Sequence, residues 1–215
     1  MRSANDDRVL QRKLPGNGSD LGLIAVADGI SRCPSGGMVA HFIVEEHLAN
    51  DLIFAGGNGP LANQFEDYLA GLGERFYAEH ANEPDMLESG ATLSAALLEG
   101  ETAHCFWVGD SPIVVARRCA ERFETVQISV PDTFGRVLID CFGAGAPFVV
   151  KRSHTVLARG DVLLVGSDGA IRDLESLTDL LNEHGPSCQL LSALRSGVQT
   201  APYYDDASLV LAERL

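Results

Sequence analysis

Aspartates beside glycines and apolar runs are the residues of this sequence best suited to chemistry. They occur in four short contexts: Asn5-Asp6-Asp7, Val26-Ala27-Asp28-Gly29, Gly166-Ser167-Asp168-Gly169 and Tyr204-Asp205-Asp206. In three of these contexts an apolar, strand-like run adjoins the aspartate, so a rigid element would hold the carboxylate while a glycine lets the backbone turn. Several such carboxylates brought together would form an oxygen-rich site, which suits hard divalent cations such as Mg²⁺ or Mn²⁺.

A pair of divalent ions in such a site would favour hydrolysis of a phosphate ester. Two ions about 4 Å apart lower the pKa of a water between them and neutralise charge on the phosphoryl oxygens. A carboxylate has to bridge the two ions, because two dications at that distance repel each other strongly. In this chemistry no side chain is the nucleophile, so no Ser-His-Asp or Cys-His set is required.

The bulk composition limits the class of protein. The chain has 215 residues, of which 46% are hydrophobic, so we expect one domain spanning residues 1–215 with a sizeable core. Its net charge of −14 argues against nucleic acids and anionic membranes as partners, because phosphate contacts need clustered Lys and Arg. Five cysteines without a C-x-x-C spacing predict reduced thiols, several of them in the core. The sequence has no signal-peptide stretch, so we expect a cytoplasmic protein. We also expect a monomer.

The apolar periodicity predicts where the rigid elements lie. Helical spacing appears at residues 37–55, 60–80, 174–182 and 188–198. Short apolar or alternating runs predict strands at residues 21–27, 91–98, 102–108, 112–117, 122–130, 147–151, 155–157, 162–165 and 207–212. The runs between 91 and 117 are typical of an antiparallel meander. Because strands and helices do not alternate one for one, the order favours an α+β layered domain over a doubly wound parallel sheet.

Five segments, in order along the chain, resemble the motifs of the metal-dependent protein phosphatases (the PPM family of type 2C serine/threonine phosphatases). They are Arg2 to Asp7 for R-x-x-N-E-D, Val26 to Gly29 for V-A-D-G, Ser89 to Thr92 for S-G-T-T, Val108 to Ser111 for V-G-D-S-R, and Ser167-Asp168-Gly169 with Asp205 to Ser208 for S-D-G and D-N-x-T. Each motif alone is weak, but five in order over nearly the whole chain are strong. The resemblance implies a four-layer αββα sandwich of two antiparallel sheets flanked by helices.

The resemblance also implies which residues hold two Mg²⁺ or Mn²⁺ ions at the edge of the sandwich. Asp28 would bridge the two ions. Asp168 and Asp205 would complete the shell of one ion. Asp6 and the carbonyl of Gly29 would serve the other.

Three further residues gain a role from the resemblance. Asp7 would orient metal-bound water, Asp110 would hold a third and weaker ion, and Arg2 would bind the substrate phosphate. Asp6 stands where the family more often has Glu, whose side chain is one methylene longer. The stretch 131–145, where the family carries a flap beside the cleft, is short, which predicts altered substrate choice more than lost chemistry.

Each of these aspartates also has a plainer interpretation. Asp28 and Asp168 can serve as ordinary turn residues after a strand. Asp110 can sit in a hairpin turn between two strands. Asp6 and Asp7 can be solvated acids near a frayed terminus.

The preferred interpretation is a metal-dependent phosphatase that hydrolyses phosphoserine or phosphothreonine in a protein substrate. Two others stay open. Since no strand precedes Arg2, the chain can instead be an inactive pseudophosphatase that binds a regulatory partner. It can also be a metal-dependent hydrolase of another phosphoester, such as a nucleotide. Metal titration and a substrate panel would separate these classes.

Overall fold

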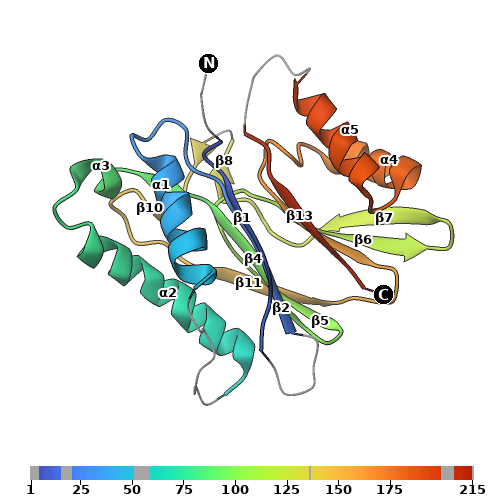
Figure 1. The fold of residues 1–215 in the computed structure, drawn as a ribbon, viewed down its shortest axis with the longest axis horizontal. Helices are drawn as coiled ribbons and strands as arrows, with labels where there is room; N and C mark the ends of the chain where they lie inside the picture. Colours follow the sequence, from blue (N-terminus) through green and yellow to red (C-terminus); the bar gives the residue numbers. More distant parts are fainter. Residues whose placement is uncertain (1–4, 16–20, 51–58, 136, 200–205, 215) are drawn as a thin grey trace.

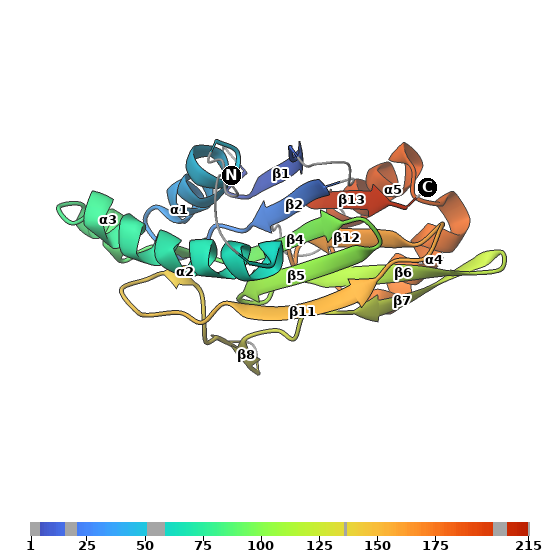
Figure 2. The same ribbon diagram turned by 90° about the horizontal axis from the view of Figure 1, so that it is seen from below.

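Two antiparallel sheets, stacked face to face, form the centre of the computed structural model, which describes residues 5–15, 21–50, 59–135, 137–199 and 206–214 (Figures 1 and 2). The first sheet has the order β1 (Arg8–Lys13), β2 (Leu21–Ala27), β4 (Leu93–Glu99), β5 (Thr102–Val108) and β11 (Lys151–Val156). The second has the order β13 (Leu209–Glu213), β12 (Val162–Gly166), β6 (Ile113–Cys119) and β7 (Arg122–Gln127). Two short pairs join β10 (Phe142–Gly143) to β3 (Gly90–Ala91) and β8 (Thr133–Phe134) to β9 (Val137–Leu138).

Helices cover the outer face of each sheet, as the two views of the ribbon show. On the first sheet lie α1 (Gly36–His41), η1 (Phe42–Leu48) and α2 (Leu61–Glu79), with the short α3 (Pro84–Leu87) beyond them. On the second lie α4 (Leu174–His184) and α5 (Cys188–Gln199). The predicted four-layer αββα sandwich is therefore confirmed.

Three apolar layers hold the four structural layers together. Leu23, Ala25 and Phe106 face η1 and α2, whereas Ile24 and Val26 face the second sheet. Successive side chains of a strand point to opposite faces, so β2 is apolar along its whole length because both of its faces are buried. The third layer lies between the second sheet and α4 with α5.

The predicted elements agree with the structure where a strand or helix has a continuous run or stripe of buried side chains, and differ where exposed residues interrupt it. Strand β2 has the predicted bounds, and α2 differs from the prediction by one residue at each end. The predicted strands 147–151 and 155–157 are wrong, because one strand, β11, spans Lys151–Val156. Strand β1 was not predicted at all. Both β1 and β11 lie at the edges of their sheet and alternate exposed with half-buried residues, so their sequences are largely polar.

The predicted helix at residues 37–55 begins one residue earlier and changes type after His41. From Phe42 to Leu48 it is a π-helix, with the Ala49 N–H donating to the Val44 carbonyl five residues back at 2.9 Å. Three consecutive side chains, Phe42, Ile43 and Val44, are all buried there. The wider π turn accommodates this broad apolar face, which an α-helical periodicity does not anticipate.

The predicted meander is only partly correct, because β5 and β6 lie in different sheets. Strands β4 and β5 do form an antiparallel pair in the first sheet. The chain then crosses from one sheet to the other through Gly109, Asp110 and Ser111. Asp110 is therefore in a crossover between the layers, and the hairpin-turn interpretation of this residue is wrong.

The cysteines are all free, as expected, but only Cys105 is buried. The expectation of several cysteines in the core is therefore wrong. Burial raises the pKa of the Cys105 thiol to about 12. Within the described residues, no helix is both long enough and apolar enough to cross a membrane.

A buried ion pair links both sheets at the end of β6. Asp161 is 2% exposed, and its carboxylate accepts hydrogen bonds from the Arg117 side chain at 2.6 Å, the Arg118 N–H at 3.0 Å and the Ala158 N–H at 2.9 Å. The Arg117 guanidinium also donates to the hydroxyl of Thr155 on β11 at 2.6 Å. Burial raises the pKa of Asp161, but these hydrogen bonds outweigh it and leave the pKa below its ordinary value of 3.8.

The variant Asp161→Asn is expected to unfold about 2–3 kcal/mol more easily at pH 7, because it loses hydrogen bonds to a charged group. A lowered folded-state pKa means that the stabilisation is complete above pH 3.8 and is lost as the pH falls through the lowered value. Urea unfolding of both proteins, measured from pH 7 down through the lowered pKa of Asp161, tests this. The two curves should converge at low pH; a constant difference would contradict the assignment.

Candidate metal centre

One edge of the sandwich gathers four of the predicted aspartates, Asp6, Asp7, Asp28 and Asp168, because the strands next to them start or end there. Arg8 pairs with Ala27 in the β1–β2 register, so Asp7 and Asp28 are the next residues at the same end. Gly166 pairs with Leu209, which brings Ser167 and Ser208 to the corresponding end of β12 and β13. Strand β13 contacts both β1 and β2, and the starts of β1 and β13 lie at the same edge in Figure 1.

Asp7 is the most deeply buried carboxylate of this edge, with 5% of the residue exposed. Neither of its carboxylate oxygens has a hydrogen-bond partner among the described residues. Burial, and then the negative charge of Asp206, raise the pKa of Asp7. The nearby side chains of Asp28, Ser208 and Ser167 offset part of that rise without a hydrogen bond of regular geometry. Asp7 is therefore not a solvated acid.

Asp6 is held between the C-terminal segment and the first turn of α1. Its N–H donates to Oδ2 of Asp206 at 2.8 Å. Its carboxylate lies so close to Gly37 that a Cβ atom there would be 2.6 Å from Asp6 Oδ1. A Cβ on Gly29 would lie 2.6 Å from the carbonyl carbon of Gly36 and from the nitrogen of Gly37. Glycine is thus required at position 29 by close approach of the backbone, and at position 37 by the Asp6 carboxylate.

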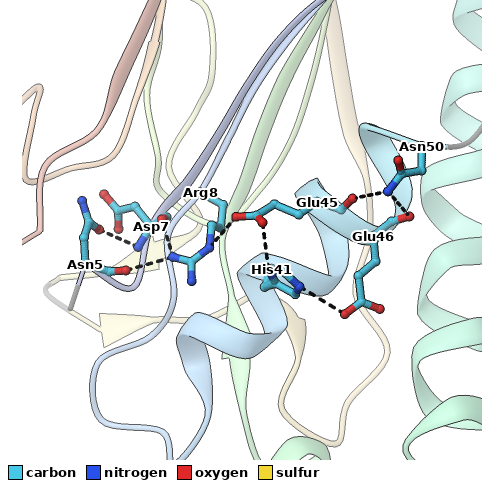
Figure 3. A network of polar contacts seen from close by, with 7 residues as sticks. All are labelled: Asn5, Asp7, Arg8, His41, Glu45, Glu46 and Asn50. Atoms are coloured by element: carbon cyan, nitrogen blue, oxygen red, sulfur yellow. Dashed lines mark hydrogen bonds and ion pairs between the residues drawn. The ribbon is translucent and has the colours of Figure 1, made fainter.

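A polar network anchors the N-terminal segment to the helix beside it (Figure 3). The Arg8 side chain donates to the carbonyls of Asn5 and Asp7 at 2.9 and 2.8 Å and forms an ion pair with Glu45 at 2.8 Å. The side chain of Asn5 accepts from the Asp7 N–H at 2.7 Å. Oε2 of Glu45 also lies 3.1 Å from Nδ1 of His41, so the network continues along the helix.

Two serines join the ends of β12 and β13. The Ser208 N–H donates to the hydroxyl of Ser167 at 3.0 Å, and the Ser167 N–H donates to the Ser208 carbonyl at 2.9 Å. Ser167 directly precedes Asp168, which is exposed at the end of β12. The reciprocal bonds fix the segment that follows Asp205 and Asp206 against the one that leads into Asp168.

The comparison with known families identifies the family of the chain. Residues 3–200 match the family described as Protein phosphatase 2C. The chain belongs to the protein phosphatase 2C family. The family resemblance seen in the sequence is therefore confirmed, and membership assigns the chain to a family of metal-dependent phosphoprotein hydrolases. No curated protein matches the chain significantly.

Solved phosphatase structures share the fold of this phosphatase 2C chain. A serine/threonine phosphatase of S. agalactiae is 17% identical, with a TM-score of 0.82 over 100% of this chain and 95% of that one. Serine/threonine phosphatase Stp1 from Staphylococcus aureus is 17% identical, with a TM-score of 0.81 over 99% and 90%. The catalytic domain of PstP, in complex with two manganese ions, is 22% identical, with a TM-score of 0.72 over 98% and 91%.

The aspartates gathered at this edge offer carboxylate oxygens, which are suitable ligands for a divalent cation. A buried carboxylate without a hydrogen-bond partner, such as that of Asp7, is costly unless a positive charge compensates it. Within the described ranges, no three His, Cys, Asp or Glu side chains alone form a group that would hold a metal ion. Asp205, a predicted ligand, and Arg2, the predicted phosphate clamp, lie outside those ranges.

Sequence reasoning missed the residues that hold the predicted ligands in place. Asp206 has no role in the sequence analysis, which includes Ser167 and Ser208 only as parts of motifs. Gly36 and Gly37 received no role. The doublet Gly36-Gly37 beside a predicted helix start was a usable signal, because two adjacent glycines there indicate close backbone approach.

The variant Asp7→Asn is expected to raise the thermal stability of the metal-free phosphatase domain by about 1 kcal/mol, because a neutral amide replaces a buried charge of the same shape. The same change should weaken Mn²⁺ binding. Thermal unfolding with EDTA and with Mn²⁺ measures both effects. Wild type should gain more stability from Mn²⁺ than the variant; equal gains would mean that Asp7 does not act on the ion.

Proposed function

We propose that this phosphatase 2C chain hydrolyses phosphoserine and phosphothreonine in proteins, with a water activated by a dinuclear Mg²⁺ or Mn²⁺ centre. The observation that carries the proposal is the Asp7 carboxylate, buried without a hydrogen-bond partner beside Asp28 and Asp206. Structural reasons alone do not account for three acids gathered at one edge, because like charges repel. The proposal treats residues 1–215 as one domain that acts as a monomer.

The proposed roles of the ligands are those that the family resemblance implies. Asp28, at the end of the buried strand β2, would bridge both ions, with Asp168 and Asp205 on one ion. Asp6 and the Gly29 carbonyl would hold the other ion. When bound, the ions would supply the activated water and neutralise charge on the phosphoryl oxygens.

The remaining residues would bind and orient. Asp7 would accept a hydrogen bond from the attacking water and fix its direction, since its own oxygens have no other partner among the described residues. Arg2 would bind the phosphate through its planar, two-pronged guanidinium. Arg8 would keep Asp6 and Asp7 in place through its bonds to the Asn5 and Asp7 carbonyls.

The decisive experiment measures phosphate release from a phosphothreonine peptide with Mn²⁺ and with EDTA, for wild type and Asp168→Ala. Turnover that requires Mn²⁺ and is lost in the variant would support the proposal. Turnover that survives EDTA would contradict metal dependence. No turnover with Mg²⁺ or Mn²⁺ from a folded protein would favour a binding module without catalysis. A panel with nucleotide esters separates the remaining class, because a nucleotide hydrolase would prefer them to the peptide.

A further inference from the structure

Asp132 is a buried acid that the proposed centre does not use. It follows β7 and directly precedes the β8–β9 hairpin, and only 6% of it is exposed. Its N–H donates to the Gly109 carbonyl at 3.0 Å, and its Oδ2 accepts from the Gly109 N–H at 2.9 Å. The two bonds close a ring between Asp132 and the residue immediately before Asp110.

The other two polar atoms of Asp132 bind two further segments. Its Oδ1 forms an ion pair with Nζ of Lys151, the first residue of β11. Its carbonyl accepts from the Ile139 N–H at 2.8 Å, on the return side of the hairpin. Lys151 Nζ also lies 3.7 Å from Oδ2 of Asp140, so one ammonium joins both ends of the hairpin. Asp132 therefore binds three separate segments: the turn at Gly109, the return side of the hairpin at Ile139, and the start of β11 at Lys151.

The hairpin has little packing of its own to fix its direction. Phe134, Val137 and Ile139 are 82%, 64% and 66% exposed. Pairing within β8–β9 joins only two residues of each strand. Because an isolated hairpin of this size is marginal in water, the contacts at its base have to hold it.

The turn that contains Gly109 and Asp110 is connected through Thr92 to the edge that carries Asp28. Gly109 has a φ of +100°, and a Cβ there would lie 2.8 Å from Cβ of Thr92. The Thr92 N–H donates to the carbonyl of Asp28 at 2.9 Å, and its hydroxyl lies 2.5 Å from that of Ser111. The hairpin base, the Asp110 turn and the backbone of Asp28 thus form one connected unit.

We propose that Asp132 is a positioning residue that, locked by Lys151, holds the Asp110 turn and the β8–β9 hairpin as one rigid unit. The inference rests on the proposed function, in which Asp110 holds a further divalent ion. Loss of the Asp132 contacts then has two effects: Asp110 is no longer aimed at its ion, and the hairpin loses the bonds that hold its base.

The test compares Asp132→Ala, Asp132→Asn and Lys151→Met with Arg152→Met. Arg152 is the matched control, because it is the next residue of β11 and its charge is also paired. Hydrogen exchange of the metal-free proteins is measured at the amides of Gly109 and Ile139. Asp132→Ala should speed exchange at both amides about tenfold or more. The Gly109 amide loses its bond to the Asp132 carboxylate, and the Ile139 amide keeps a carbonyl partner whose position the carboxylate no longer fixes. Asp132→Asn and Lys151→Met should give smaller increases there, and Arg152→Met none.

The second arm titrates each protein with Mn²⁺ by calorimetry. Asp132→Ala should weaken the weakest Mn²⁺ site about tenfold and leave the tighter sites unchanged, which a merely structural role would not do. Three results would overturn the proposal: an unchanged exchange rate at the Gly109 amide, an equal increase in exchange rate throughout β12, or an unchanged affinity of the weakest Mn²⁺ site. A wild type that releases no phosphate would count against the proposed function instead, because the exchange arm needs no turnover.

Discussion

Replacing Asp28 by alanine is expected to abolish Mn²⁺-dependent phosphate release, with a loss of about a thousandfold or more. The reason is its position: Asp28 extends from β2, a strand buried on both faces, and lies beside Asp7 at the edge where β1, β12 and β13 meet. As the proposed bridge, it would bind both ions at once, so no single substitution elsewhere would remove as much. Phosphate release from a phosphothreonine peptide measures the loss.

The control for this variant is Asp67→Ala, which removes an exposed carboxylate from the outer face of α2. Its activity should equal that of wild type, so any general effect of lowering the negative charge is excluded. Circular dichroism and calorimetric Mn²⁺ titration of Asp28→Ala should show a folded protein that binds Mn²⁺ poorly. Wild-type turnover in that variant would refute the two-ion assignment.

The variant Gly29→Ala is expected to unfold about 3 kcal/mol more easily and to bind Mn²⁺ weakly. The added Cβ would lie 2.6 Å from backbone atoms of both Gly36 and Gly37. Backbone atoms cannot move aside as the end of a side chain can, so the first turn of α1 has to shift. Gly37 in turn lies against the Asp6 carboxylate, so the shift would reach a proposed ligand. Urea unfolding and Mn²⁺ titration measure the two effects separately.

The matched control is Gly22→Ala in β2, the strand that leads into Asp28 and Gly29. There the nearest atoms to an added Cβ lie at 3.7 Å, which is ordinary van der Waals contact. We expect a change in stability of less than about 1 kcal/mol, with Mn²⁺ binding unaltered. If both variants lost the same stability, the loss would reflect the exchange of glycine for alanine in general and not the close approach at Gly29.

The sequence predicts the layered fold because most strands are buried on both faces and therefore read as apolar runs. Residues 21–27 are the clearest case, since Leu23 and Ile24 face different apolar layers. The aspartate contexts are recognisable in the sequence for a related reason, because three of the four adjoin such apolar runs. Edge strands such as β1 do not carry this signal, because half of their side chains face water.

The supporting contacts of the site could not be predicted, because they join residues that are distant in sequence. The bond from Asp6 to Asp206 spans 200 positions, and no local pattern marks it. The ring between Asp132 and Gly109 likewise depends on how the two sheets stack. The π-helical turn at Phe42 is set by the packing of three neighbouring side chains, which overrides the periodicity of the sequence.

The chain contains one tryptophan, and its place gives the molecule a built-in optical probe. Trp107 is 6% exposed, and its indole N–H donates to the Val130 carbonyl at 2.9 Å, two residues before Asp132. It also pairs across the strands with Lys151. Its emission wavelength and quenching by acrylamide therefore respond directly when the base of the hairpin opens to water. Stopped-flow mixing can follow that event in the unlabelled protein.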